Sequence, residues 1–495
     1  MILGYDVGSS SVKATLIDAD TGKALASATS PDKELEMIAE QIGWAEQHPK
    51  TWWEHVTNAT KKIKSQVKFD AGDVKAIGIS YQMHGLVVVD KNQQVLRPSI
   101  IWCDSRAVPY GQQAAEKIGP EKCLKNLFNL PGNFTITKLM WVKENEPDLY
   151  AKIDKMMLPG DYIAMKMTGD IKTTPSGLSE GIIWDYENDK LADFVLDEIG
   201  ISNELIADRV QTFSIQGELT SEAAQELGLK AGTPVSYRAG DQPNNALSLS
   251  VLEPGEVAVT AGTSGVVYGI SDQKNYDKLS RVNAFIHVNH TSKAPRYGVL
   301  LCVGGTGILN SWLKHNFMSE GLDYPQMNEI AAQAPVGSDG LVILPYGNGA
   351  ERTLENKNIG ASVHGWNFNI HKKAHFLRAA QEGIVFALNY GLGIMKNIGI
   401  ELKTVKAGNA NMFLSPLFAE AFATVTGATV QLYSTDGSQG AARGAGIGAG
   451  IYSSAEDAFV GLEPVKTIKP NEDLTSAYTK AYQNWQNVLN KQMKS

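Results

Sequence analysis

The sequence predicts an α/β protein built from two similar halves. A strand, a polar turn and a second strand occupy residues 2–18, and the same pattern returns at residues 257–269. The chain has 495 residues, which is too long for one hydrophobic core. We therefore expect a duplicated domain, with one half at residues 1–247 and the other at residues 248–495.

The composition is that of an ordinary globular protein, with 43% hydrophobic and 20% charged residues. The net charge of −8 argues against a broad basic face, so no nucleic-acid partner is expected. No apolar run reaches about 18 residues, so no membrane partner is expected. The three cysteines are scattered and odd in number, which fits a reducing cytoplasm, and we expect no signal peptide.

The turn of the first hairpin carries groups that suit phosphate. Exposed amides, hydroxyls and an ammonium bind phosphate oxygens, and a nearby carboxylate suits a hydrated Mg²⁺. The stretch lacks the GxxxxGK[ST] pattern of a P-loop. An ordinary edge hairpin with a polar turn is the alternative. The candidate residues are Asp6, Ser9, Ser10, Ser11 and Lys13.

Two further strand ends carry polar groups. A buried strand at residues 74–80 leads into Gln-Met-His-Gly, which contains Met83 and His84, and the strand near residue 100 leads to Asp104 and Arg106. Ligands of open α/β sheets bind beyond the carboxyl ends of strands. Mixed donors and acceptors beside an apolar wall suit a polyol. A structural histidine and a plain Asp–Arg ion pair are the alternatives.

A third strand leads through a glycine to Asp241 and Gln242, at the start of a helix. This repeats the pattern in which a strand delivers a carboxylate to a glycine turn. A helix N-cap is the alternative interpretation of Asp241. Asn133 precedes another expected helix, where contact with a sugar and a role in a cap or turn are equally favoured.

Glycine-rich turns in the second half are candidates for nucleotide binding. The second hairpin turn contains Gly262 and Thr263, and Gly305 lies in a turn before a helix. Gly408 and Asn411 lie in another such turn, and helix N-termini attract phosphate. Single turns of this kind are weak signals. The small-residue run at residues 440–450 predicts a helix packed closely on its neighbours.

Taken together, these motifs resemble the FGGY carbohydrate kinases of the actin and sugar-kinase ATPase superfamily. The resemblance covers essentially the whole chain. The Gln-Met-His-Gly element is similar to that of family members that act on xylulose, whereas glycerol kinases carry an Arg-Glu pair there. The matching stretches are residues 4–13, 82–85, 102–106, 240–241 and 260–264.

The resemblance implies two ribonuclease-H-like domains with a catalytic cleft between them, a sugar-binding domain at residues 1–247 and an ATP-binding domain at residues 248–495. It implies ATP-dependent phosphorylation of D-xylulose to D-xylulose 5-phosphate, with Asp241 as general base and Asp6 holding Mg²⁺ through water. Sugar contacts would come from Met83, His84, Asp104, Arg106, Asn133 and Gln242. ATP contacts would come from Ser9, Ser10, Ser11, Lys13, Gly262, Thr263, Gly305, Gly408 and Asn411.

Two departures from the family pattern matter: the first leaves the exact pentulose open, and the second affects nucleotide packing but not the reaction class. Many xylulose-directed members carry Ser-Asp-Ala-Ser/Ala-Gly-Thr where this chain has residues 176–181, with a displaced Glu, and the turn at Ala407 lacks the usual first glycine. Another pentulose or hexulose kinase, such as one similar to the ribulokinases, stays an alternative. A non-catalytic, actin-like nucleotide switch is a further one. The sequence leaves open whether the chain forms a homodimer.

Overall fold

The computed structural model describes residues 1–318, 321–402 and 404–494. It confirms the α/β class and the two domains, because the chain forms two compact units that each contain a large mixed sheet. Unit 1 comprises Met1–Leu252, Phe285–Tyr297 and Thr435–Leu462, and unit 2 comprises Glu253–Ala284, Gly298–Ser434 and Glu463–Ser495. The units are thus discontinuous in sequence, and a division of roles between residues 1–247 and 248–495 stays a prediction.

Unit 1 is built on a six-stranded sheet. The predicted first hairpin is present, with Asp6 opposite Lys13, and β5 runs parallel to both β1 and β14. In spatial order the strands are β13 (Phe213–Glu218), β14 (Pro234–Gly240), β5 (Ile77–Tyr81), β1 (Ile2–Val7), β2 (Val12–Ile17) and β3 (Ala24–Ser30).

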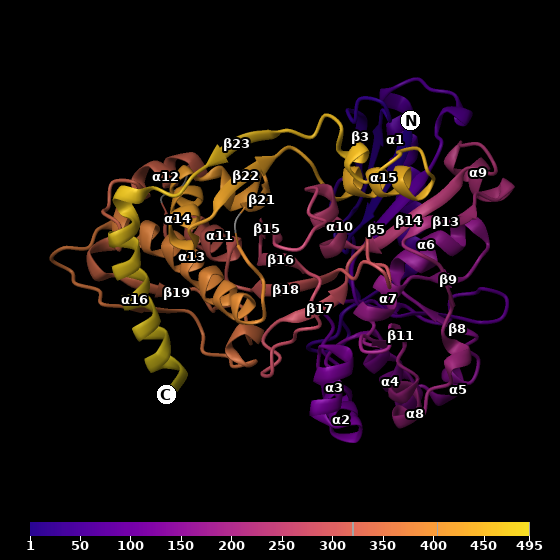
Figure 1. Ribbon diagram of the computed structural model, residues 1–495, viewed down its shortest axis with the longest axis horizontal. Coiled ribbons are helices and arrows are strands. Elements are labelled where there is room, and N and C mark those ends of the chain that lie inside the picture. Colours follow the sequence, from indigo (N-terminus) through magenta and orange to yellow (C-terminus); the bar gives the residue numbers. More distant parts are fainter. Residues whose placement is uncertain (319–320, 403, 495) are drawn as a thin grey trace. The chain divides into compact units, whose positions relative to one another are not determined.

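Small residues bring helix α15 (Gly437–Gly448) against this sheet, as the sequence predicted (Figure 1). A Cβ on Gly4 would lie 2.4 Å from the backbone nitrogen of Ala442, and one on Gly78 would lie 1.9 Å from the carbonyl oxygen of Ala441. Alternate residues of β1 point to the other side of the sheet, where they share a core with α1 (Pro49–Gln66).

The remaining helices of unit 1 are short. One of them, α7, is capped by Thr174, whose hydroxyl accepts a hydrogen bond from the amide of Gly177. The helices are α2 (Val108–Ile118), α3 (Pro120–Leu127), α4 (Thr135–Asn145), α5 (Pro147–Tyr150), α6 (Pro159–Thr168), α7 (Pro175–Glu180), α8 (Asp193–Ile199), α9 (Ser221–Leu227) and α10 (Asp241–Ser248).

Short strand pairs complete the loops of unit 1. They are β4 (Glu46–Gln47) with β7 (Ser99–Ile100), β6 (Val87–Val89) with β8 (Lys155–Met157), β9 (Lys172–Thr173) with β12 (Asp208–Arg209), and β10 (Trp184–Asp185) with β11 (Lys190–Leu191).

Unit 2 repeats the plan, with an antiparallel hairpin of β15 and β16 and with β21 parallel to β15 and β22. Its sheet runs β17 (Asn283–Ile286), β18 (Tyr297–Val303), β16 (Gly265–Ser271), β15 (Glu256–Ala261), β21 (Thr404–Gly408), β22 (Thr429–Tyr433) and β23 (Pro464–Ile468). A separate pair joins β19 (Val342–Leu344) to β20 (Ser362–His364).

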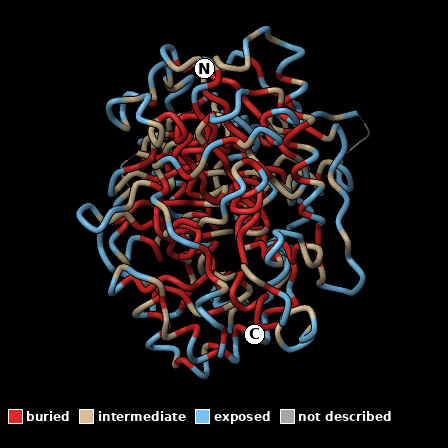
Figure 2. Tube along the Cα trace, turned by 90° about the vertical axis from the view of Figure 1, so that its right-hand side faces the viewer, coloured by how far each residue is buried: buried red, intermediate tan, exposed pale blue. Residues whose placement is uncertain are grey.

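The helices of unit 2 are α11 (Gly307–Asn316), α12 (Tyr324–Ala331), α13 (Lys373–Asn397), α14 (Pro416–Thr426) and α16 (Glu472–Lys494). Buried side chains of α13 and α14 share one core with the strands and with Trp485 of α16. Figure 2 shows the buried residues in the interior of the fold and many of the exposed ones in loops at its surface. None of the described helices combines the length and the apolar character needed to cross a membrane.

The close approach of α15 gives a test of the fold. We expect Gly78→Ala to lower the free energy of unfolding by roughly 1–3 kcal/mol, because the new methyl group overlaps the backbone of Ala441. Gly393→Ala in α13 is the matched control, since its methyl group would meet nothing within 4 Å and should stabilise by about 0.4–1 kcal/mol. Denaturant unfolding measures both. Equal effects would show that the helix does not press on the strand.

Candidate functional site

Three parallel strands of unit 1 end at one edge of its sheet. Since β1 and β14 both run parallel to β5, their carboxyl ends lie together. Asp6 lies near the end of β1, Met83 and His84 follow β5, and Asp241 follows β14. The predicted carboxylates and the Met-His pair therefore come together on one edge, although they lie far apart in the sequence.

Asp6 is held from the sheet and faces the start of α15. The hydroxyl of Ser80 donates to its carboxylate at 2.8 Å, and a Cβ on Gly437 would come within 2.3 Å of Asp6 Oδ2. Only a glycine leaves room for this carboxylate. Burial, together with the negative charge of Asp436, raises the pKa of Asp6.

Lys13, a candidate phosphate ligand, forms an ion pair within the protein. Its ammonium lies 2.6 Å from the carboxylate of Asp436, just before α15, and its side chain is 38% exposed. The neighbouring turn is also engaged, because Gln47 donates to the carbonyl oxygen of Ser9 and Trp102 donates to its hydroxyl. Ser10 is exposed and Ser11 is partly buried.

Asp241 is the first residue of α10, and Gly240 occupies the N-cap position. The N-cap interpretation of Asp241 is therefore wrong. Its carboxylate accepts from the backbone and side chain of Gln242. Burial raises the pKa of Asp241 to about 7, and the charge of Asp6 adds to this effect. A carboxylate with a pKa near neutrality is suited to accept a proton.

His84 has a left-handed backbone conformation, with φ of 62°. Its Nδ1 donates to the carbonyl oxygen of Glu180 at 3.1 Å, and its own carbonyl oxygen accepts from Lys138 Nζ at 2.7 Å. The ring packs edge-on against Phe134 at 4.8 Å. Beside it, a Cβ on Gly240 would lie 2.5 Å from Met83 Cγ. The Met-His pair is thus fixed by contacts from several elements.

Two of these contacts come from residues outside the sequence motifs, Glu180 and Lys138. Glu180 is buried at the end of α7, and Tyr81 donates to its carboxylate at 2.7 Å. Burial, with added repulsion from Asp241 and Asp161, raises the pKa of Glu180 well above its usual value. Burial lowers the pKa of Lys138 to about 7. The displaced Glu at residues 176–181 was the signal for Glu180, whereas Lys138 had none.

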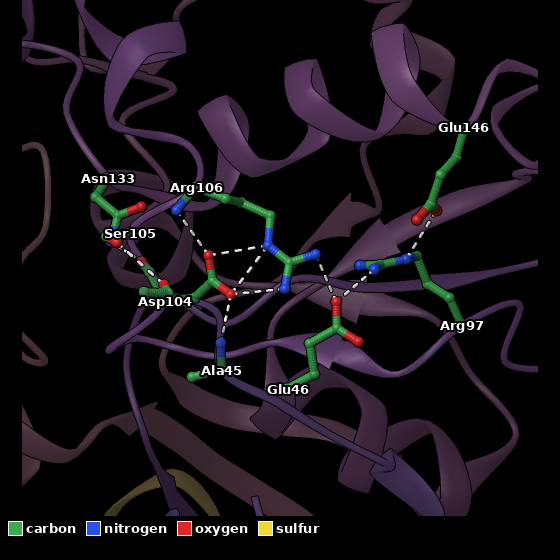
Figure 3. A network of polar contacts seen from close by, with 9 residues as sticks. Ala45, Glu46, Arg97, Asp104, Ser105, Arg106, Asn133 and Glu146 are labelled. Carbon is green, nitrogen blue, oxygen red and sulfur yellow. Dashed lines mark hydrogen bonds and ion pairs between the residues drawn. The ribbon is translucent and has the colours of Figure 1, made fainter. Parts of the chain in front are cut away.

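Asp104 and Arg106 form a buried ion pair (Figure 3). The Asp104 carboxylate accepts from the amide of Ala45 at 2.6 Å, and from the amide and guanidinium of Arg106. The guanidinium also binds Glu46 at 2.6 Å and stacks on Trp44 at 3.7 Å. These contacts favour the plain ion-pair alternative, and direct contact of either side chain with a sugar stays a prediction.

Asn133 connects this network to the loop before α4. Its side-chain amide donates to the carbonyl oxygen of Asp104, and both Asn133 and Gln242 are partly exposed. Arg97 extends the network by binding Glu46 and Glu146. The alternation of acidic and basic groups in Figure 3 leaves each charge with an opposite neighbour.

Unit 2 contains a separate cavity of about 930 Å³. Three of the predicted nucleotide-binding residues line it, namely Gly262, Thr263 and Asn411. Gly305 lies in the turn before α11, whereas Gly408, expected in a turn, is the last residue of β21, and neither lines the cavity. A cavity of this size with mainly apolar walls and a few polar groups is typical of a small-molecule site.

The glycine turn before α11 is held by backbone contacts rather than open to a ligand. The amides of Gly307 and Ile308 donate to the carbonyl oxygens of Gly262 and Thr263, at 2.8 and 3.1 Å. These two amides are therefore unavailable to a phosphate. The Glu351 carboxylate, 3% exposed, accepts from the amide of Gly304 at 2.9 Å. Burial raises the pKa of Glu351 to about 7.

Among the described residues, no group of three or more His, Cys, Asp or Glu side chains is arranged to hold a metal ion. A metal that depends on many protein ligands is therefore not indicated there. Mg²⁺ differs, because it keeps several waters and needs only one or two carboxylates. The carboxylate of Asp6, positioned by Ser80 at the sheet edge, fits that requirement.

Comparison with known proteins identifies the class. The model for the FGGY family of carbohydrate kinases matches in both parts, the N-terminal domain at residues 1–248 and the C-terminal domain at residues 257–452. The chain belongs to this family, so it is a sugar kinase by class. The resemblance inferred from the sequence motifs is confirmed.

Individual relatives narrow the comparison. The chain is 30% identical to a xylulose kinase of Bacillus subtilis over 462 residues, which cover 92% of this chain and 90% of that protein. A solved structure described as a xyloylose kinase from Brucella ovis is 26% identical, with a TM-score of 0.88 and 98% of each chain covered. A gluconate kinase from Lactobacillus acidophilus is 22% identical with a TM-score of 0.91, covering 100% of this chain and 98% of that one, which shows the shared fold alone.

Glu351 gives a pH-dependent prediction. Its folded-state pKa is raised, so its contribution to stability is complete below about pH 4.5 and is lost as the pH rises through about 7. We expect the stability of the native protein relative to Glu351→Gln to fall by up to about 3 kcal/mol between pH 4.5 and 8. Glu355→Gln, at an exposed neighbour, is the control. Denaturant unfolding of both proteins across this pH range measures the difference in their free energies of unfolding. A difference that does not change with pH would contradict a raised pKa of Glu351 in the folded protein.

Proposed function

We propose that this protein is a xylulose kinase, which transfers the γ-phosphoryl group of ATP to the terminal hydroxyl of D-xylulose and gives D-xylulose 5-phosphate. The similarity to xylulose kinases over nearly the full chain supports this proposal. The observation that carries it is the Gln-Met-His-Gly turn at the end of β5, on the same sheet edge as Asp241.

Asp241 is the proposed general base. Phosphoryl transfer to an alcohol needs positioning, charge neutralisation and a group that accepts the hydroxyl proton. A carboxylate whose pKa is about 7 is partly ionised at neutral pH and can both accept and release that proton. Gln242, whose side chain donates to Asp241, orients the carboxylate and is a proposed sugar contact.

Asp6 is the proposed carboxylate for Mg²⁺, through water. Mg²⁺, when bound, would neutralise charge on the phosphate oxygens. The hydroxyl of Ser80 orients the Asp6 carboxylate through one oxygen. Because residue 437 is a glycine, no side chain there crowds the other carboxylate oxygen. We propose that the hairpin turn contacts the phosphates of ATP through Ser9, Ser10, Ser11 and Lys13. Lys13 also forms an ion pair with Asp436.

Met83 and His84 are the proposed direct sugar contacts. They combine an apolar surface with a ring nitrogen, and the buried Lys138 and Glu180 hold their turn. Asp104 and Arg106 are proposed as positioning residues that act through Asn133, because their own hydrogen-bonding groups already bind each other and Glu46.

The cavity of unit 2 is the proposed site of the nucleotide base, with Gly262, Thr263 and Asn411 as contacts. Gly305 would shape the turn before α11, and Gly408 the end of β21. Water competes with the sugar for the phosphoryl group, so transfer must be favoured only when the sugar is bound.

A coupled ADP-release assay with a panel of sugars tests the proposal. We expect D-xylulose to give the highest kcat/KM among D-xylulose, D-ribulose, L-ribulose, gluconate and glycerol. The reason is that this chain has the Met-His turn where glycerol kinases carry an Arg-Glu pair. ADP release without sugar sets the background. A higher kcat/KM with any other sugar would overturn the assignment to xylulose while leaving the kinase class intact.

A further inference from the structure

The cavity of unit 2 is walled mainly by apolar side chains. The walls include Ile308 of α11, Leu417 of α14 and Pro325 of α12. Met412, which follows Asn411 in the sequence, also lines the cavity. Such walls suit the flat faces of a nucleobase but do not distinguish one ring edge from another. Discrimination needs a polar group with a fixed orientation.

Asn328 of α12 lines the same cavity and is half-buried. Its side-chain oxygen accepts a hydrogen bond from Gln381 Nε2 of α13, at 2.9 Å. Gln381 is buried, with 2% of its surface exposed, and does not line the cavity. The contact therefore reaches Asn328 from behind, through the protein interior.

Gln381 is itself oriented by the start of α14. Its oxygen accepts from the hydroxyl of Ser415 at 2.8 Å. The Ser415 oxygen in turn accepts from the backbone amide of Phe418, as the N-cap of α14. In the structure all three hydrogen bonds run the same way, from the Phe418 amide to Ser415, from the Ser415 hydroxyl to Gln381, and from the Gln381 amide to Asn328.

That direction determines what Asn328 offers. The carbamoyl oxygen is used by Gln381, and among the described residues none accepts a hydrogen bond from Asn328 Nδ2. The side chain is thus left with N–H donors for the cavity. The complementary group on a ligand is a hydrogen-bond acceptor in the plane of the base, and adenine has three such ring nitrogens, N1, N3 and N7.

We propose that Asn328 is a specificity-determining residue, which donates a hydrogen bond to a ring nitrogen of adenine and is held in the donating orientation by Gln381 and Ser415. The proposal rests on the proposed function, since it takes the unit 2 cavity as the site of the ATP base. It adds to that site one residue, Asn328, and its role as a hydrogen-bond donor.

Two substitutions reverse this polarity in different ways. Asn328→Asp replaces the donors by a carboxylate of the same shape. Gln381→Glu leaves the cavity lining unchanged but supplies an acceptor behind Asn328, so the Asn328 amide should turn and present its oxygen instead. We expect either change to raise KM for ATP roughly ten- to hundredfold, because a hydrogen bond is lost and an acceptor faces an acceptor. KM for the sugar should stay within about twofold.

The matched control is Gln333→Glu, the same chemical change at an exposed position beyond α12. It should leave KM for ATP unchanged. Thermal unfolding checks each variant. Because a buried glutamate can destabilise the core, Asn328→Asp decides the result if Gln381→Glu does not fold.

ATP analogues identify the contacted atom. We expect one of 1-deaza-, 3-deaza- and 7-deaza-ATP to bind the native enzyme about tenfold more weakly than ATP, and to lose nothing further in Asn328→Asp. If the native enzyme transfers phosphate but Asn328→Asp keeps its KM for ATP, the role of Asn328 is refuted and the kinase assignment survives. If no nucleotide supports transfer by the native enzyme, the proposed function itself fails.

Discussion

The parallel pairing of β5 with both β1 and β14 is the constraint on which the unit 1 site depends. It places the ends of three strands, and with them Asp6, the Met-His turn and Asp241, on one edge. Burial raises the pKa of Asp6 and of Asp241, and the negative charge of Asp6 adds to the shift of Asp241. Shifts of this kind are common where groups exchange protons, which supports the proposed role of Asp241 as general base.

Small residues keep that edge in place. Gly4 and Gly78 of the sheet meet the backbone of α15 directly, and Gly437 at the start of this helix faces the carboxylate of Asp6. The helix therefore carries both a packing contact and the boundary of the site. Asp436, just before it, also fixes the ammonium of Lys13. A segment that follows most of unit 2 in the sequence thus completes unit 1.

Local patterns were enough to predict the two hairpins, the small-residue helix and the strand that leads to Asp241, because glycine turns and apolar alternation are written in neighbouring residues. Contacts across long separations were not predictable. Glu180 meets Tyr81 across 99 positions, and Glu351 meets Gly304 across 47. The motif around Asp104 and Arg106 was recognised, but its burial under Trp44 and beside Glu46 depends on packing that the sequence does not display.

The most direct test of the central claim, that Asp241 accepts the hydroxyl proton, is the turnover of Asp241→Asn measured beside its binding of sugar and ATP. Asparagine keeps the shape but cannot take the proton, so kcat should fall by about 10²–10⁴ while both dissociation constants and the melting temperature stay close to those of the native enzyme. Asp197→Asn, at an exposed residue of α8, controls for the loss of one carboxylate. Turnover within a few fold of the native enzyme in a folded Asp241→Asn variant would contradict the account.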